Sequence, residues 1–194
     1  GDIAFGTIIK PCTGINAREE AEIVGALAND GFFMFIKEDE NFLPGAGFAP
    51  LKERLVPVME AVKRARAAGK GRSVIFAPHV TSPPQFLAEN IRIAVEAGCT
   101  GVMLSEYYTG GSYRMVRDLT ADSGTPPVLY GHNGGISVRT RHIWREVLDL
   151  FARLDGVDMR QTAPVTAGLG LLRPTASNGG TASECSPNHA RDTN

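Results

Sequence analysis

The stretch FIKEDEN at residues 35–41 sets an apolar run directly against a cluster of charge. The aromatic and branched residues that lead into it are typical of a buried strand. One lysine and three acidic residues follow within four positions: Lys37, Glu38, Asp39 and Glu40. Because successive side chains of a strand point to opposite sides, Lys37 and Asp39 project to the same side. The stretch therefore predicts a buried strand with ionisable groups at its carboxyl end.

This charge cluster has two interpretations. Asp39 and Glu40 suit Mg²⁺, because this ion prefers one or two carboxylates together with water and substrate oxygens. Lys37 is first of all a counter-ion to these acids, and it joins a metal shell only after losing its proton or reacting with CO₂ to form a carbamate. The alternative interpretation is a solvated charge cluster at the end of a strand.

Apolar strands alternate with amphipathic helices along the chain. The pattern predicts strands at residues 3–10, 32–38, 73–78, 100–107, 127–132 and 157–163. It predicts helices at residues 17–29, 51–68, 84–97, 112–121 and 138–154. Such alternation is typical of parallel β/α units, which form either a TIM barrel or a doubly wound sheet. No GxGxxG follows the first strand and no GxxxxGK[ST] occurs, which argues against a nucleotide-binding doubly wound sheet.

Local signals mark several helix boundaries and faces. Asn16 is an expected N-cap and Gly31 an expected end for the helix at residues 17–29. Pro57 lies inside the pattern of the next helix, which predicts a kink or a later start. The last helix is expected to bury one apolar stripe, made of Ile143, Val147, Leu150, Phe151 and Leu154.

Composition excludes several classes of partner. The net charge of −1 gives no electrostatic reason to bind nucleic acid or an anionic membrane. No run of 18 apolar residues and no leader with a cleavage site is present. The three cysteines, Cys12, Cys99 and Cys185, are few, odd in number and far apart. They indicate free thiols in a reducing compartment, so we expect a cytoplasmic protein without nucleic-acid or membrane partners.

Other polar residues end neighbouring strands. Lys10 precedes a proline, and it is either a Schiff-base former or proton carrier, or a lysine that reaches to solvent. His79 and His132 end two further strands, where a histidine is either a hydrogen-bonded structural group or a catalytic one. The glycines in YYTGGS and GHNGG either present backbone N–H groups to a phosphate or form ordinary turns.

Taken in order, four segments resemble the large subunit of ribulose bisphosphate carboxylase (rubisco). They are GTIIKPCTG at 6–14, FIKEDEN at 35–41, YYTGG at 107–111 and GH at 131–132. The resemblance implies a partial TIM (β/α)₈-type barrel with about six β/α units over residues 1–165. The polar, aperiodic residues 166–194 are expected to form a disordered tail.

The resemblance also implies roles for individual residues. Mg²⁺ would be bound by a carbamylated Lys37 with Asp39 and Glu40. Lys10 and His132 would be catalytic, with Lys10 as the proton-transferring base and His132 near the metal. We expect four residues to bind substrate: His79, Gly110, Gly111 and Asn133.

The sequence departs from the carboxylase pattern at several sites. Cys12 and Ile8 replace a lysine and a threonine, Asn133 replaces a phosphate-binding arginine, and no lysine follows Lys70. The chain is therefore most similar to form IV, or rubisco-like, proteins, which are enolases, isomerases or decarboxylases. We expect Mg²⁺-dependent enolisation of a phosphorylated sugar or keto compound. The alternatives are carboxylation of ribulose bisphosphate and an inactive or structural fragment.

The chain is shorter than a complete eight-unit barrel. An eight-unit barrel needs about 250 residues, whereas the chain has 194. We therefore expect a fragment that lacks the amino-terminal domain and the last barrel units. By resemblance, the intact protein would be a homodimer acting on a small phosphorylated substrate.

Overall fold

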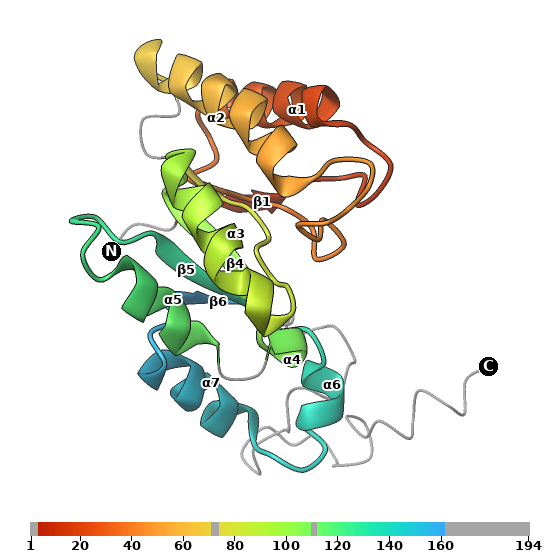
Figure 1. The fold of residues 1–194 in the computed structure, drawn as a ribbon, viewed down its shortest axis with the longest axis vertical. Helices are drawn as coiled ribbons and strands as arrows, with labels where there is room; N and C mark the ends of the chain where they lie inside the picture. Colours follow the sequence, from red (N-terminus) through yellow and green to blue (C-terminus); the bar gives the residue numbers. More distant parts are fainter. Residues whose placement is uncertain (1–3, 71–73, 110–111, 162–194) are drawn as a thin grey trace, which may run out of the picture.

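The computed structural model describes residues 4–70, 74–109 and 112–161 of the chain (Figure 1). The strands are β1 Gly6–Ile8, β2 Phe35–Lys37, β3 Ile75–Ala77, β4 Gly101–Ser105, β5 Val128–His132 and β6 Met159–Arg160. The longer helices are α1 Ala17–Asp30, α2 Leu51–Ala67, α3 Pro84–Glu96, α5 Tyr113–Thr120 and α7 Arg145–Leu154. Two single-turn helices, α4 Glu106–Thr109 and α6 Ile136–Arg139, follow β4 and β5.

The strands are parallel and lie side by side in chain order. β1, β2 and β3 form one ladder, and β4, β5 and β6 form a second. A parallel bridge between His79 and Met103 joins the two ladders. The carboxyl ends of all the strands therefore lie along one edge, where the loops that follow them meet. This arrangement confirms a parallel α/β fold.

Apolar side chains fill both sides of the sheet. The larger core lies between the strands and the helices, and it includes Ile36, Val58, Phe76 and Leu104. Figure 1 shows α1 and α2 side by side over the first ladder, with α3 and α5 over the second. The opposite side carries a smaller cluster of Phe35, Ala77, Met103 and Tyr130. The sheet is thus buried on both faces, as parallel sheets require.

The predicted boundaries of the first two helices can be compared with the structure. Asn16 caps α1, because its side chain accepts from the backbone of Arg18 and Glu19 while Glu19 bonds back. Gly31 ends α1 with a positive φ of 77°. Both predictions are confirmed. α2 begins at Leu51 and contains Pro57 in its interior, so a later start is wrong.

The predicted helix at residues 138–154 is wrong as one element. The structure divides this region into α6 and α7, with an extended backbone at Trp144. At the end of α6, both the backbone N–H and the hydroxyl of Thr140 donate to the carbonyl of Ile136 at 2.9 Å. Similarly, α4 replaces the end of the strand predicted at 100–107. The strand predicted at 157–163 is only β6, and residues 162–194, including the predicted tail, lie outside the described residues.

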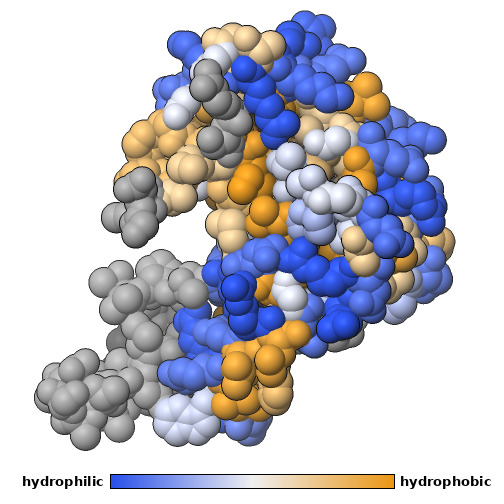
Figure 2. Space-filling model, turned by 90° about the vertical axis from the view of Figure 1, so that its left-hand side faces the viewer, coloured by the Kyte–Doolittle hydropathy of each residue, from blue (hydrophilic) through white to orange (hydrophobic). Residues whose placement is uncertain are grey.

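The predicted buried stripe of the last helix is also wrong. Its members are exposed: Ile143, Val147, Leu150, Phe151 and Leu154. α7 buries Leu148 and Ala152 instead. Figure 2 shows a hydrophobic patch at the lower end of the molecule, where α7 lies in Figure 1. Periodicity identifies an apolar face, but it does not determine which face of the helix meets the strands.

Replacing leucine by alanine is expected to lower the free energy of unfolding by different amounts on the buried and exposed faces of α7. Leu148→Ala is expected to lower the free energy of unfolding by about 2–5 kcal/mol, because Leu148 is buried and packs on Ile136. Leu150→Ala is expected to change it by about 0.5 kcal/mol or less, because that side chain is 57% exposed. Urea unfolding followed by circular dichroism measures both. Equal losses in the two variants would show that the outer face of α7 is packed.

Candidate functional site

Lys10 and Asp39 meet where β1 and β2 end. The ammonium of Lys10 donates to Oδ2 of Asp39, while Oδ1 accepts from the backbone and side chain of Asn41 at 3.0 and 2.8 Å. Asp39 is fully buried, whereas the Lys10 side chain is 60% exposed. Burial alone would raise the pKa of Asp39, but the hydrogen bonds from Lys10 and Asn41 outweigh it and lower that pKa. The bond to Asp39 raises the pKa of Lys10, so this pair is ionised.

Lys37 lies buried at the end of β2. Its Nζ approaches the carbonyl of Glu38 at 3.2 Å and Sδ of Met103 at 3.6 Å, and it lies 5.6 Å from the ring centre of Tyr130. Burial lowers the pKa of Lys37 to about 8, although Glu40 and Asp39 oppose this change. A lysine of this kind has more neutral amine at neutral pH than an exposed lysine has. The neutral amine is the form that reacts with CO₂.

Glu40 turns toward β5. Its Oε2 lies 3.4 Å from Nε2 of His132, and Nδ1 of His132 accepts from the backbone of Gly134 at 3.0 Å. Burial, followed by the charge of Lys37, lowers the pKa of His132, so the ring is neutral and carries its proton on Nε2. His132 therefore donates toward Glu40. The structure therefore pairs Glu40 of the charge cluster with His132 of β5.

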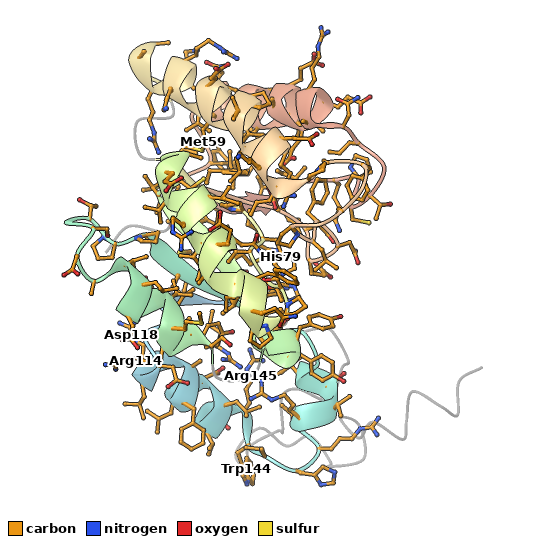
Figure 3. The ribbon with its side chains drawn as sticks, viewed as in Figure 1. Met59, His79, Arg114, Asp118, Trp144 and Arg145 are labelled. Carbon is orange, nitrogen blue, oxygen red and sulfur yellow. The ribbon has the colours of Figure 1, made fainter. Side chains whose placement is uncertain are left out.

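His79 lies at the centre of the molecule, two residues after the end of β3 (Figure 3). The residue is fully buried, and its backbone N–H donates to Oε2 of Glu38 at 2.8 Å. Burial first, and then the charges of its neighbours, lower the pKa of His79 to about 3. Neither ring nitrogen has a hydrogen-bond partner among the described residues. The imidazole is therefore neutral, and its hydrogen-bonding capacity is unused.

A buried ionic network lies behind these residues. Arg54 pairs with Glu38 through Nε–Oε1 at 2.9 Å and Nη2–Oε2 at 2.7 Å. Arg54 also donates to the carbonyls of Ala49 at 2.7 Å and Phe42 at 3.0 Å. Glu20 lies 3.9 Å from Arg54, and burial, then repulsion from Glu38, raises the pKa of Glu20 to about 9. Because Glu38 stands between Lys37 and Asp39 in the chain, this network anchors the end of β2.

Sequence analysis did not single out this network, although a signal was present. Arg54 lies three residues after Leu51 and four before Val58, so it falls within the apolar stripe of α2. Glu20 lies four residues before Val24, within the buried face of α1. A charged residue inside an apolar helical stripe is rarely buried without a partner. The pattern could therefore have indicated that α1 and α2 share a buried polar contact.

A cleft of about 870 Å³ opens beside Glu40. The loops after β2 and β3 form its walls, together with α4. Its lining includes Asn41, Leu43, Pro44, Thr81, Ser82 and Tyr108. The cleft has the volume that a small organic ligand needs, and one carboxylate of the charge cluster reaches into it.

The structure brings most of the predicted site residues to one edge of the sheet. Lys10 contacts Asp39, Glu40 faces His132, and the charge of Lys37 lies near enough to lower the pKa of His79. Asn133 begins the loop after β5, and its carbonyl accepts from the backbone of Ile136. Gly110 and Gly111 lie outside the described residues. The roles in substrate binding and catalysis remain predictions for all of these residues.

The donor set for Mg²⁺ at this edge consists of two carboxylates, to which a modified Lys37 would add a third group. Within the described residues, no group of three or more His, Cys, Asp or Glu side chains could hold a metal ion. Asp39 and Glu40 supply two carboxylates, which suits Mg²⁺ together with water and substrate oxygens. A carbamate on Lys37 would add a third anionic oxygen ligand.

No helix in the described part of the chain is long and apolar enough to cross a membrane.

Comparison with known proteins identifies relatives of the chain. The family profile of the ribulose bisphosphate carboxylase large chain, catalytic domain, matches residues 1–175. The chain is 34% identical over 164 residues to a 3-oxo-isoapionate-4-phosphate decarboxylase of Rhizobium rhizogenes, covering 81% of the chain and 37% of that protein. It is 27% identical over 125 residues to a 2,3-diketo-5-methylthiopentyl-1-phosphate enolase of Microcystis aeruginosa, covering 64% of the chain and 31% of that protein.

Solved structures show the same similarity. A rubisco-like protein from Burkholderia fungorum aligns with a TM-score of 0.70 at 32% identity, over 80% of the chain and 38% of that protein. The rubisco of Pyrococcus horikoshii aligns with a TM-score of 0.74 at 24% identity, over 84% of the chain and 38% of that protein, and it shares the fold. The chain spans less than two fifths of the length of each of these relatives.

Proposed function

The chain belongs to the ribulose bisphosphate carboxylase large chain family, catalytic domain, and from that premise we propose that it carries an Mg²⁺-dependent site for enolising a phosphorylated sugar or keto compound. The observation that carries this proposal is that charged residues converge at the edge of the sheet where the strands end. Asp39 meets Lys10, Glu40 meets His132, and Lys37 lies buried beside them.

Each residue has a distinct role in this proposal. Asp39, Glu40 and a carbamylated Lys37 would hold the metal. Bound Mg²⁺ would polarise a ketone oxygen and stabilise the enolate. Lys10 would transfer the proton at the neighbouring carbon, since its exposed ammonium stands at the mouth of the site. His132 orients Glu40 through its Nε2–H rather than acting as a base, because Nδ1 is already bonded to Gly134.

Two reactions fit this site, and both pass through an enolate. Removal of a proton beside a ketone gives the enolate directly, whereas loss of CO₂ from a 3-oxo acid leaves the same kind of enolate. The relative with 34% identity is named a decarboxylase of a 3-oxo sugar acid phosphate, and the relative with 27% identity is named an enolase. The greater similarity favours decarboxylation, so we place a phosphorylated 3-oxo acid first and a phosphorylated diketone second.

The proposal also covers the barrel, the oligomeric state and the substrate. We propose that residues 1–165 form about six β/α units of an eight-unit barrel, which the parallel strands in chain order support. By family resemblance, the active protein would be a cytoplasmic homodimer. Its partner molecule would be a small phosphorylated substrate, for which the cleft beside Glu40 has the volume.

Calorimetric titration of the full-length protein with Mg²⁺ tests the proposal. The expected result is binding that strengthens when bicarbonate is added, and bicarbonate should have no such effect in Lys37→Ala. An exposed lysine on α2, Lys63, provides the control Lys63→Ala, which should titrate as the wild type does. Binding that ignores bicarbonate would indicate a site made of carboxylates alone. If the wild type binds no Mg²⁺ under either condition, the proposed function is wrong.

A further inference from the structure

The walls of the cleft beside Glu40 present apolar surface. Leu43, in the loop after β2, is 46% exposed, and Tyr108, on α4, is 65% exposed. Pro83 and Pro84, where α3 begins, form a further part of the wall. Apolar side chains that gather on a concave surface are typical of a groove that binds a ligand. The lining therefore indicates an occupant with apolar surface of its own.

Two polar side chains of the cleft are already engaged within the protein. Oγ1 of Thr81 accepts from the backbone N–H of Ser105 at 2.8 Å. Oγ of Ser82 accepts from Nδ2 of Asn90 at 2.9 Å. Each hydroxyl keeps its own proton to donate, which suits a neutral acceptor. A phosphate is normally held by several charged or backbone N–H donors, and these two hydroxyls do not replace them.

The charge of the cleft is unsuited to an anion. None of the described residues that line it is a lysine, arginine or histidine, and Glu40 contributes a carboxylate. Although α3 begins at the cleft, Pro84 has no N–H, and the N–H of Phe86 donates to the carbonyl of Pro83 at 2.9 Å. The start of α3 therefore offers fewer of the donors with which a helix N-terminus binds phosphate.

Glu40 connects the cleft with the proposed metal site. Its side chain lines the cleft, and its Oε2 also lies 3.4 Å from Nε2 of His132. A substrate whose ketone is held at the metal site would extend the rest of its chain past Glu40 into the cleft. A phosphate at that end would meet a carboxylate and no cation. An uncharged chain would instead cover the apolar surface of Leu43 and Tyr108.

We propose that the cleft binds the uncharged, apolar part of the substrate's carbon chain, with Leu43 and Tyr108 as the residues that determine this specificity. The inference rests on the proposed function and adds that the phosphate of the substrate lies outside the cleft. Burial of alkyl or thioether carbons against these two side chains supplies the affinity. A phosphorylated keto compound with an uncharged chain beyond its ketone fits the cleft, whereas a chain with phosphate at both ends does not.

Calorimetric titration of the full-length protein with alkyl monophosphates, in the absence of Mg²⁺, tests the inference. From butyl to hexyl phosphate, the Kd should fall about fourfold for each methylene added, because each methylene is removed from water. The bisphosphate of hexane-1,6-diol should bind about tenfold more weakly than hexyl phosphate, because its second phosphate would lie beside Glu40 without a cation.

Variants of the cleft wall have a matched control. Leu43→Ser and Tyr108→Ser should each reduce the gain per methylene to about twofold or less, because the chain then loses apolar contact. Leu119 on α5 is 48% exposed, close to the value for Leu43, and lies outside the cleft lining. Leu119→Ser should keep the wild-type gain. All three substitutions change exposed side chains, so the variants are expected to fold.

Three results would overturn the inference. They are a Kd that does not depend on chain length, the same dependence in Leu43→Ser as in Leu119→Ser, and tighter binding of the bisphosphate than of hexyl phosphate. Because these titrations contain no Mg²⁺, their outcome is separate from that of the Mg²⁺ titration. A protein that binds Mg²⁺ but shows no dependence on chain length refutes this inference alone. One that shows the dependence but binds no Mg²⁺ refutes the proposed function and keeps the apolar cleft.

Discussion

Replacing Arg54 by methionine is expected to lower the free energy of unfolding by about 3–5 kcal/mol, because it leaves Glu38 as an unpaired buried charge. Both side chains of the pair are fully buried. The guanidinium also satisfies the carbonyls of Phe42 and Ala49, which hold the loop between β2 and α2. Urea unfolding followed by circular dichroism measures the loss.

Matched variants separate this effect from a general loss of charge. Arg18 is an exposed arginine of α1 that pairs with Glu22 at 3.0 Å, so Arg18→Met should cost less than about 1 kcal/mol. Glu38→Gln in the Arg54→Met background should recover part of the loss, because an amide is no longer an unpaired charge. A cost for Arg54→Met no larger than that for Arg18→Met would contradict the expected result.

Glu20 provides a further comparison within the same network. Its pKa of about 9 keeps it protonated near neutral pH. Glu20→Gln therefore replaces one neutral group by another of similar shape, and it should leave stability at pH 7 nearly unchanged. Arg54 and Glu20 touch the same network, yet only Arg54 compensates a buried charge. The contrast between their variants tests this physical account directly.

Replacing Lys10 by methionine is expected to slow proton exchange at the substrate carbon by about 10²–10⁴-fold, the contribution typical of a positioned acid or base. The ion pair with Asp39 raises the pKa of Lys10, so this structure shows the lysine in its protonated form. In the proposed function, a metal ion on Asp39 would compete with Lys10 for the carboxylate and so weaken the main cause of the raised pKa of Lys10.

The measurement is exchange of substrate hydrogen with deuterated water, using a phosphorylated diketone and the full-length protein. Mg²⁺ affinity should persist in Lys10→Met, because Lys10 is not a ligand and its loss frees Asp39. Lys52 is an exposed lysine of α2, and Lys52→Met should exchange at the wild-type rate. Unchanged exchange in Lys10→Met would remove Lys10 from the chemistry and leave it as a counter-ion of Asp39.

Local signals in the sequence were sufficient for many elements. The capping box at Asn16, the glycine at position 31 and the apolar run into Lys37 each depend on neighbours within a few residues. Alternating strands and helices predicted the parallel order of the sheet. That order placed Lys10 and Asp39 at one edge before any contact was known, since parallel strands align their carboxyl ends.

Tertiary packing determined the side-chain contacts and burial that the residue spacing in the sequence does not specify. The residue order indicated which residues stand at the strand ends, but the fold paired Glu40 with His132 and left the ring nitrogens of His79 without partners among the described residues. It also turned the apolar stripe of α7 outward and buried Arg54. Hydrophobic periodicity is a property of one chain segment, whereas burial and pKa depend on groups that distant segments bring within a few ångströms.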